Sequence, residues 1–238
     1  MLQPVDFFNL SNTAVAPFFE GCEFVWEAIA HIGAHVERLT QGRQVILGEV
    51  MLGAYLSDRP IYVGQGAVIE PGAYIIGPAY IADGAVVKHG ALVRENVILL
   101  EGSVLGHSSE AKNSLFLPGA HAPHFNYVGD SILGMGVNLG AGTKLSNLGI
   151  LSEKDRQSGK RPSIIVYVQD EMYDTGLTKF GAVLGDGVQT GCNAVLNPGC
   201  LVGPRTLIYA NLSLRKGYHP ANSVIKLRQN TRVVPRNR

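Results

Sequence analysis

Apolar residues recur at every sixth position over a long central part of the chain, and a mostly small residue follows each of them four positions later. An amphipathic helix needs an apolar residue every three or four positions and a half-exposed strand needs one every second, so neither fits. The aliphatic positions are Val63, Ile69, Ile75, Ile81, Val87, Val93, Leu99 and Leu105, and the residues after them are Ala67, Ala73, Ala79, Ala85, Ala91, Val97, Ser103 and Ser109. This register predicts short flat strands joined by corners, which is typical of a parallel β-helix built from hexapeptides.

The register also indicates where the side chains point. The aliphatic residue of each hexad faces the inside of a narrow prism and stacks on its neighbours in the coils above and below. The residue four positions later lies near a corner, where only a small side chain fits. Glycine, proline and aspartate occupy many remaining positions and suit tight turns, because glycine tolerates positive φ angles. We therefore predict an all-β solenoid of about six to seven coils.

The first 50 residues do not follow this register. Apolar residues from Pro17 to Thr40 fall at helical spacing, so we predict one helix over this range, with Gly42 as its stop signal. We expect the helix to cover the first coil and to shield the open strand edge that a solenoid exposes there. The alternative is a helix that binds a partner and exposes Trp26.

The register weakens after Leu105. Leu117 keeps the phase, but the stretch His121–His124 does not, and we expect that stretch to leave the prism as a loop or a bent corner. The register then holds on both sides of a second gap, at Leu133, Leu139, Leu145, Leu184, Thr190, Leu196, Val202, Ile208 and Leu214.

The second gap, residues 149–178, is interpreted as an insertion carried by the solenoid. It begins with a charged piece, continues with an apolar run over residues 164–168 and ends in acidic residues, which predicts an external hairpin or long loop. The predicted organisation is a helical cap over residues 1–50, a β-helix over residues 51–225 and a basic tail over residues 226–238. We expect the tail to be solvated, with anion binding as the alternative.

Composition narrows the class of protein. Apolar residues make up 46% and charged residues 16% of the 238 residues, as in a protein with a normal buried core, and 29 glycines suit a chain with many corners. The net charge of +1 favours neither nucleic acid nor a membrane surface as partner. The three cysteines lack metal-ligand spacing and the start of the chain lacks a basic signal region, so we expect a reduced, cytoplasmic protein.

Side chains able to carry chemistry gather where the register breaks. A repeated core is easily continued, so departures from the repeat are places where functional groups can be positioned. The polar residues around these departures are Arg94, Glu110, Lys112, His124, Asn126, Tyr127, Asn138, Asn147 and Lys179.

Two stretches in this region read ALVRENVILLEGSVLGHSSEAKNS and APHFNYVGDSILGMGVNLGAGTKLSN. They resemble the acetyltransferase half of the bacterial bifunctional enzymes that acetylate glucosamine-1-phosphate and then uridylylate it, whose pattern runs R-P-G-A, V-K-K, A-G-H-L-x-Y-L-G-D, N-I-G-A-G-T and N. The later DTGLTKFGAVLGDGVQTGCNAVLNPG is similar to the archaeal forms. The resemblance covers about residues 60–215 and leaves out the nucleotidyltransferase domain, so we do not expect uridylyl transfer. It implies left-handed coils of three hexads each.

The resemblance implies catalytic roles for two residues. His124 stands where the family keeps its general base, which takes a proton from the sugar amine as the amine attacks an acetyl thioester. An imidazole suits this role because its ordinary pKa lies near neutral pH, although a lone histidine would be interpreted as lining a corner. Asn147 matches an asparagine near the amine and the thioester, where a backbone N–H would stabilise the oxyanion. His121 has no match in the family.

The resemblance also implies substrate contacts. Arg94, Lys112 and Lys179 match positions that hold the sugar phosphate, and a guanidinium can bind two phosphate oxygens at once. Each cation alone would be interpreted as solvated surface charge, but three in register favour an anion site. Tyr127 and Asn138 match contacts to the sugar hydroxyls and the phosphate.

Three further residues match the path of the acyl donor. Ala141 and Ala210 match places where the pantetheine arm of acetyl-CoA runs along the coils, although corner packing explains two small residues equally well. Cys192 replaces a serine near this cofactor, and we do not expect it to act as a nucleophile because no histidine neighbours it in sequence. Leu148 and Glu95 also depart from the family pattern, which leaves the acceptor sugar and the acyl length open.

The sequence therefore predicts an acetyl-CoA-dependent N-acetyltransferase that acts on an amino-sugar phosphate such as glucosamine-1-phosphate, in the synthesis of UDP-N-acetylglucosamine. Acetyl-CoA is the expected co-substrate, no metal is expected, and the three-sided prism favours a homotrimer. The resemblance implies that the active sites lie between adjacent prisms. The alternatives are an acyltransferase that acts on a nucleotide sugar or with a longer acyl chain, and a non-catalytic hexapeptide scaffold. The scaffold would have no need of His124 together with Arg94, Lys112 and Lys179.

Overall fold

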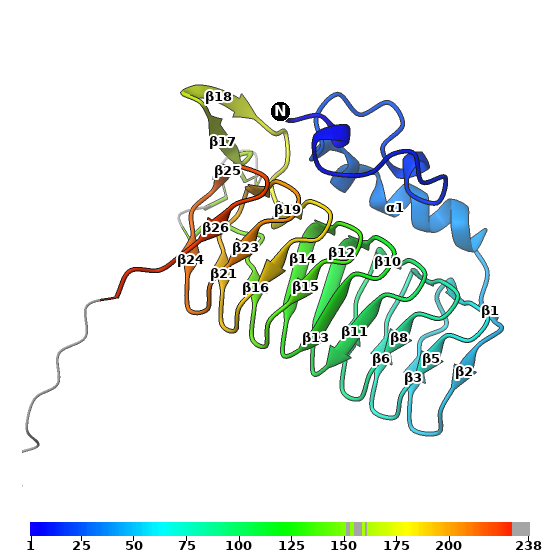
Figure 1. Cartoon of the computed structure of the whole chain (residues 1–238). Coiled ribbons are helices and arrows are strands. Elements are labelled where there is room, and N and C mark those ends of the chain that lie inside the picture. Colours follow the sequence, from blue (N-terminus) through cyan, green and yellow to red (C-terminus); the bar gives the residue numbers. More distant parts are fainter. Residues whose placement is uncertain (151–152, 155–158, 160, 230–238) are drawn as a thin grey trace, which may run out of the picture.

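The computed structural model describes residues 1–150, 153–154, 159 and 161–229, and Arg232, Arg236 and Arg238 of the predicted tail lie outside this range. The described chain is a solenoid with three stacks of parallel strands, here called faces 1, 2 and 3 (Figure 1). The predicted all-β class and the parallel β-helix are confirmed.

Each coil contributes one strand to each face, with few exceptions. Face 1 consists of β1 (Val45–Ile46), β4 (Ile61–Val63), β7 (Ala79–Ile81), β10 (Val97–Leu99), the second halves of β12 (Glu110–Phe116) and β14 (Tyr127–Leu133), β19 (Ala182–Leu184), β22 (Cys200–Val202) and β25 (Gly217–His219). Face 2 consists of β2 (Glu49–Val50), β5 (Val68–Ile69), β8 (Val86–Val87), β11 (Val104–His107), β13 (His121–His124), β15 (Asn138–Leu139), β20 (Gln189–Thr190), β23 (Leu207–Ile208) and β26 (Val224–Ile225). Face 3 consists of β3 (Tyr55–Leu56), β6 (Tyr74–Ile75), β9 (Leu92–Val93), the first halves of β12 and β14, β16 (Lys144–Leu145), β21 (Val195–Leu196) and β24 (Ser213–Leu214).

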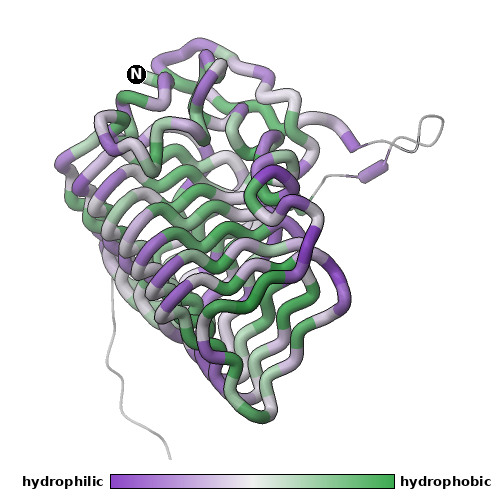
Figure 2. The backbone as a smooth tube through the Cα atoms, turned by 90° about the vertical axis from the view of Figure 1, so that its right-hand side faces the viewer, coloured by the Kyte–Doolittle hydropathy of each residue, from purple (hydrophilic) through white to green (hydrophobic). Residues whose placement is uncertain are grey.

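The interior follows the six-residue register. The aliphatic residues from Val63 to Leu105 and the small residues that follow them are all buried, and hydrophobic segments recur coil after coil (Figure 2). Stacking of short parallel strands lets every coil bury its inward side chains against the next coil, which is how a narrow prism obtains a core.

The solenoid is longer than the register suggests. Face 2 alone has nine strands in the described part of the chain, so the prediction of six to seven coils is wrong. The first coil was missed because its inward residues, Ile46, Val50 and Leu56, are not spaced evenly by six. The strands β1 and β2 place the start of the solenoid before residue 51.

One coil is a residue shorter than the coil before it, and this shift corrects two predictions. Val93 pairs with Ala111, but Val97 pairs with Ser114, so the corner after Ala111 has one residue fewer. Phe116 therefore takes the inward position that we assigned to Leu117. Leu117 is buried on the outside of face 1, under the N-terminal segment.

The same shift explains the stretch His121–His124, which stays in the prism as strand β13 and does not leave it as a loop. Ala122 is fully buried and pairs with Leu105, 17 residues earlier. Ala122 is small and lies one position before the place that the six-residue register assigns to an aliphatic residue, so the register cannot be recognised in the sequence here.

The N-terminal segment forms a layer over face 1. It contains the short helical turns η1 (Pro4–Asp6) and η2 (Ala16–Phe18) and one helix, α1 (Glu27–Thr40). The predicted helix starts too early at Pro17, because the residues before α1 form turns and Gly21 has a φ of 78°, outside helical geometry. Trp26 is 2% exposed, which rules out the alternative of an exposed partner-binding tryptophan.

The place of α1 also differs from the prediction. The helix lies along face 1 and contacts β4, β7, β10, β12 and β14, so it covers a side of the prism and not the edge of the first coil. Its buried side chains, Ile29 and Ile32 among them, pack on the outward apolar residues Ile98 and Leu115. Those outward side chains make face 1 apolar on both sides, and the layer removes the outer side from water.

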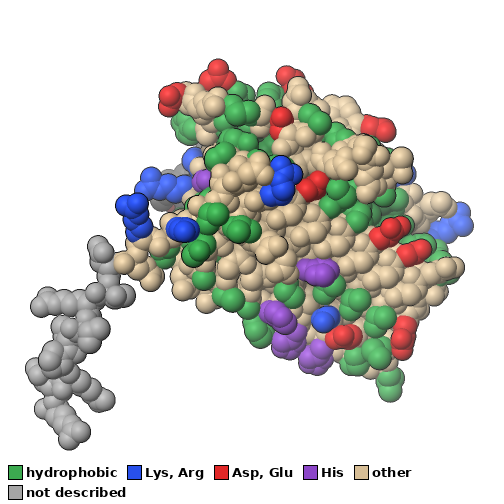
Figure 3. Space-filling model, viewed as in Figure 1, with side chains coloured by type: hydrophobic (Ala, Val, Ile, Leu, Met, Phe, Trp, Pro, Cys, Tyr) green, Lys and Arg blue, Asp and Glu red, His purple; other side chains and the backbone are tan. Residues whose placement is uncertain are grey.

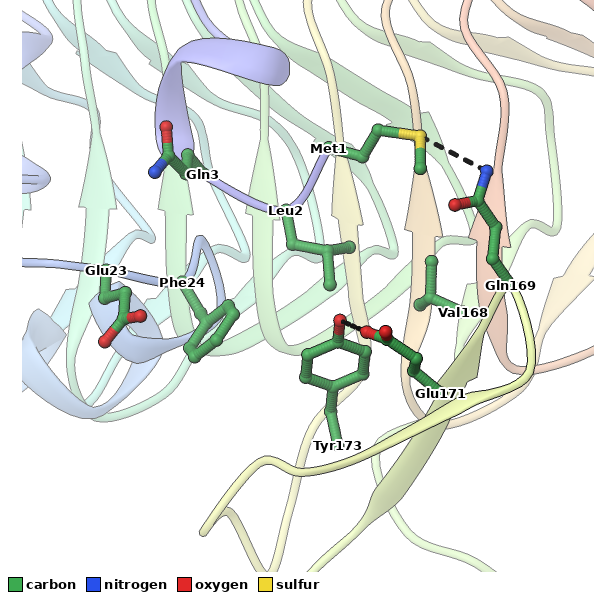
Figure 4. A pocket seen from close by; sticks show the side chains of 9 residues that line it. All are labelled: Met1, Leu2, Gln3, Glu23, Phe24, Val168, Gln169, Glu171 and Tyr173. Atoms are coloured by element: carbon green, nitrogen blue, oxygen red, sulfur yellow. Dashed lines mark hydrogen bonds between the residues drawn. The ribbon is translucent and has the colours of Figure 1, made fainter.

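The insertion contains the predicted hairpin, formed by the antiparallel strands β17 (Ile165–Val168) and β18 (Glu171–Asp174). The hairpin contacts β25 on face 1 and meets the N-terminal layer, where Tyr173 packs edge-on against the stacked rings of Phe24 and Trp26. A pocket of about 500 Å³ lies between the hairpin and the first residues of the chain (Figure 4). The hairpin therefore lies against face 1 and the N-terminal layer.

No helix in the described part of the chain combines the length and the apolar run needed to cross a bilayer.

Candidate active site

The predicted base and the three predicted cofactor contacts lie in one column along the corner between faces 2 and 3. In coil order the column is His124, Ala141, Cys192 and Ala210. The carbonyl of each of the first three accepts a hydrogen bond from the N–H of the residue after the next member, at 2.9, 2.8 and 2.9 Å. The solenoid thus stacks Cys192 and Ala210 in one column with His124, although they follow it by 68 and 86 residues in the sequence.

The backbone conformation of this corner is repeated in every coil of the column. The residue that follows each member has a positive φ, 73° at Gly142, 57° at Asn193 and 59° at Asn211. Glycine and asparagine accept this region of φ, but Phe125 after His124 also adopts it, with a φ of 52°. Phe125 is 56% exposed, so this aromatic ring is held at the surface beside His124.

Asn126 holds the corner at His124 in place. Its side chain is buried, accepts the His124 N–H at 2.9 Å and donates to the Gly140 carbonyl at 2.8 Å. Its own N–H donates to Ser109 Oγ at 3.0 Å. These bonds fix the backbone of three successive coils and leave the His124 ring exposed to solvent.

Aromatic rings continue the corner from His124 toward the first coils. The ring of Phe125 lies edge-on to His107, with centroids 5.3 Å apart, and His107 lies parallel to His89, with centroids 5.5 Å apart. Histidine side chains gather visibly on the lower part of the molecule (Figure 3). The column thus has rings on one side of His124 and small residues on the other.

A cluster of charges lies at the opposite edge of face 3, where it meets face 1. Arg94 Nη1 lies 3.1 Å from Glu110 Oε1, and this hydrogen bond is the main cause of a raised Arg94 pKa. Lys112 Nζ lies 3.6 Å from Asp130 Oδ1 and 3.8 Å from Glu95 Oε1. The Lys112 and Asp130 side chains are only 12% and 6% exposed, so this pair is the buried centre of the cluster.

Amide groups complete the surroundings of Asp130. Asn113 donates to Asp130 Oδ1 at 3.0 Å, and Asn147 donates to Oδ2 at 2.5 Å. Asp130 has a φ of 46°, in the left-handed region that aspartate tolerates better than most residues. A carboxylate with two amide donors and one ammonium is well compensated for its burial.

Tyr127 lies between the two edges of face 3. Burial raises its pKa, the charges of Glu110 and Asp130 raise it further, and its hydroxyl shares a hydrogen bond with Asn147. Gly129 makes this possible, since a Cβ there would lie 2.7 Å from both the Tyr127 hydroxyl and the Asn147 amide nitrogen. The phenol therefore stays protonated and able to donate at neutral pH.

The remaining two predicted residues lie in different places. Lys179 is exposed and directly precedes Phe180, whose N–H bonds to the Asn147 carbonyl at 3.0 Å, so it belongs to the charged edge. Asn138 lies on face 2, exposed and paired in register with His121, and the corner at His124 separates it from Tyr127. The structure thus gathers Arg94, Lys112, Tyr127, Asn147 and Lys179 on one face and leaves Asn138 on another.

Sequence reasoning missed two residues of this site. Asp130 ends the quoted motif NYVGD but received no role, and its place at the centre of the cluster depends on the stacking of neighbouring coils. Phe125 could have been noticed, because an aromatic residue occupies a corner position where neighbouring coils have serine, glycine or asparagine. Among the described residues, no group of three histidines, cysteines or acids is arranged to hold a metal ion.

Two curated proteins show the same resemblance over about half of the chain. The bifunctional sugar-1-phosphate nucleotidylyltransferase/acetyltransferase of Sulfurisphaera tokodaii is 37% identical over 102 residues, which cover 43% of this chain and 23% of that protein. The bifunctional protein GlmU of Methanococcus vannielii is 35% identical over 119 residues, which cover 50% of this chain and 26% of that protein. The chain spans about a quarter of the length of these relatives. They confirm the resemblance found in the motifs.

Solved structures show a weaker likeness. The acetyltransferase domain of PglB from Neisseria gonorrhoeae has a TM-score of 0.28 and 14% identity, and the match covers 71% of this chain and 52% of that one. The UDP-N-acetylglucosamine acyltransferase from Campylobacter jejuni has a TM-score of 0.36 and 12% identity, covering 70% and 69%. No protein-family model matches the chain.

Proposed function

We propose that this chain is an acyl-CoA-dependent acyltransferase that moves the acetyl group of acetyl-CoA to the amine of an amino-sugar phosphate such as glucosamine-1-phosphate. The observation that carries the proposal is the column of His124, Ala141, Cys192 and Ala210, which places a titratable ring at the end of a track of small exposed or half-exposed side chains. The acetyltransferase named in one of the relatives supports the reaction type.

His124 acts as the general base. The amine nitrogen attacks the carbonyl carbon of the thioester, and His124 takes the proton that the nitrogen loses. The carbon–sulfur bond then breaks, and coenzyme A leaves as the thiol after taking up a proton. The ring is exposed while Asn126 fixes its backbone, so the imidazole can approach a substrate without moving the coil.

The charged edge of face 3 holds the phosphate. Arg94 uses Nη1 for Glu110, and its Nε lies 3.7 Å from Glu95 Oε2, so the Nη2 group is the part of the guanidinium that would meet phosphate oxygens. Lys179 is in none of the ion pairs that the described residues form, whereas Lys112 is shared with Asp130 and Glu95. Face 3 is narrow: the three steps along the chain from Asn126 to Gly129 span roughly 10 Å at strand geometry. A sugar phosphate lying across Tyr127 would place its phosphate at the cationic side chains and its amine toward His124.

The track beyond His124 takes the acyl donor. Ala141 is half-buried and Cys192 and Ala210 are exposed, so the pantetheine arm of acetyl-CoA can lie against the corner without a bulky side chain in its way. Asn147 contributes through Tyr127 and Asp130, whose positions it fixes. Acetyl-CoA is a co-substrate in this scheme, and no step calls on a metal.

The same site explains why we propose a homotrimer. The N-terminal layer covers face 1, so faces 2 and 3 are free for contacts between copies. If face 2 of one copy lies beside face 3 of the next, Asn138 approaches the Tyr127 of its neighbour. Such a heterologous contact closes into a ring when the rotation is one third of a turn.

The test follows thiol release from acetyl-CoA with a chromogenic reagent, using glucosamine-1-phosphate and a panel of amino-sugar phosphates and nucleotide sugars. His124→Ala is expected to lower the turnover by about 10²–10⁴-fold, the usual contribution of a positioned proton acceptor. His121→Ala on the same strand is the control and should keep the wild-type rate. An unchanged rate in His124→Ala would refute the mechanism, and no thiol release by the wild type on the whole panel would refute the proposed activity.

A further inference from the structure

The first coil leaves the interior of the solenoid open. Ile46 and Val50 occupy the same inward positions as Val63 and Ile69 in the next coil. Val63 and Ile69 are 0% exposed, but Ile46 is 41% exposed and Val50 is 37% exposed. Side chains placed to form a core are therefore in contact with water at this end.

The rim of the same end is also apolar. Leu47, Met51 and Leu52 are 54%, 37% and 98% exposed, and Tyr55 is 57% exposed. In the described chain β1, β2 and β3 each pair with one neighbour only, namely β4, β5 and β6, so one edge of each strand has no partner. Unpaired strand edges combined with exposed apolar side chains favour pairing with another chain.

The described parts of this chain do not cover the open end. Helix α1 lies on face 1, and the N-terminus lies near the hairpin at the opposite end of the solenoid (Figure 1). Gln169 of the hairpin donates to the sulfur of Met1, which fixes that position. The last described strand, β26, also lies at the far end, beside β23.

The charges near the open end are balanced. Arg43 and Arg59 are exposed, and so are Glu49 and Asp58, which gives two charges of each sign. None of the ion pairs among the described residues involves them. A surface with equal numbers of both signs can face a rotated copy of itself without net repulsion, whereas a partner of one strong charge would meet two like charges.

We propose that the open end of the solenoid is an interface between two copies of this chain related by a two-fold axis. Each copy covers the inward side chains Ile46 and Val50 of the other, and the first-coil strands of the two copies meet edge to edge in antiparallel orientation. The contact is isologous, because the same surface is used by both partners. The contact does not depend on the proposed activity or on contacts through faces 2 and 3. It doubles the number of chains in any assembly that faces 2 and 3 form.

The test compares molar masses by light scattering after size exclusion. Leu52→Glu places a charge at the open end without removing any packing inside the subunit, since Leu52 is 98% exposed. We expect the wild-type assembly to have twice the mass of the Leu52→Glu assembly, whatever the number of chains in the latter. Val5→Glu is the matched control, because Val5 is 63% exposed on the N-terminal layer, and it should keep the wild-type mass.

Two further measurements separate the interface from misfolding. Far-ultraviolet circular dichroism of Leu52→Glu should match the wild type, and Glu49→Lys, which alters only a rim charge, should also halve the mass. Equal masses for the wild type and Leu52→Glu would overturn the proposal. So would a halved mass in Val5→Glu, or a wild type that uses this end only to bind a different protein.

Discussion

Removal of the Asp130 carboxylate is expected to destabilise the solenoid more than removal of any exposed ion pair. Asp130→Ala would remove the hydrogen bonds that Asn113 and Asn147 donate to this carboxylate. It would also leave Lys112, whose side chain is 12% exposed, without its nearer carboxylate. Breaking a buried pair by removing one partner costs about 3–5 kcal/mol. Glu95 remains 3.8 Å from the ammonium and can recover part of this, so we expect a loss of about 3 kcal/mol.

A double-mutant cycle isolates the pair. Lys112→Met leaves Asp130 with its two amide donors, so its cost should be smaller, about 1–2 kcal/mol. The double variant should cost less than the sum of the single variants by about 1–2 kcal/mol, because neither charge is then left alone. Glu110→Gln is the control, since the Arg94–Glu110 pair is about one third exposed on each side and should contribute at most about 1 kcal/mol.

Thermal unfolding followed by circular dichroism gives the comparison. For a chain of this size a loss of 3 kcal/mol corresponds to a fall in Tm of about 6–12 °C. A fall in Asp130→Ala no larger than that in Glu110→Gln would refute the reasoning, and so would strict additivity of Asp130→Ala and Lys112→Met. Either result would mean that solvent reaches the pair despite its burial.

Two other predictions follow from the same site. Gly129→Ala should displace the Tyr127 hydroxyl and the Asn147 amide, both of which are mobile side-chain ends, so that kcat/KM for acetyl transfer falls while Tm changes by less than in Asp130→Ala. Iodoacetamide at neutral pH should label the exposed Cys192 and spare Cys200, because burial raises the Cys200 pKa to about 12. Peptide mass spectrometry reads out both thiols, coenzyme A should protect Cys192, and labelling of Cys200 in the folded protein would contradict the burial.

The solenoid could be predicted because one inward side chain per strand is a local and repeated requirement. The positions from Val63 to Leu105 meet it with even spacing, so the sequence shows the coil directly. The register failed where a coil lost a residue, at Phe116 and Ala122, because a shift of one position cannot be told from a break without knowing the strand pairs. The helix was placed too early for a related reason, since the turns before Glu27 bury apolar residues on face 1 at spacings that mimic a helix.

The candidate site divides in the same way. The column of His124 and Ala141 could be predicted, because family motifs mark each residue and the solenoid then stacks them. The pairing of Lys112 with Asp130 and Glu95 could not, since it depends on which residues of three neighbouring coils meet at one corner. A motif in the sequence can identify single functional residues, whereas an ion pair between coils can be predicted only when the strand register is known.

The N-terminal layer has a consequence for how this molecule comes apart. In a bare solenoid each coil touches only its neighbours, so unfolding can begin at an end and travel along the stack one coil at a time. Helix α1 has 14 residues, about 21 Å of rise, and coils are stacked about 4.8 Å apart, so one rigid rod is fastened across several coils at once. Those coils cannot separate until α1 detaches from them, so we expect them to unfold as a single cooperative unit. The first coil, β1 to β3, lies beyond the strands β4 to β14 that α1 contacts, and we expect it to fray first.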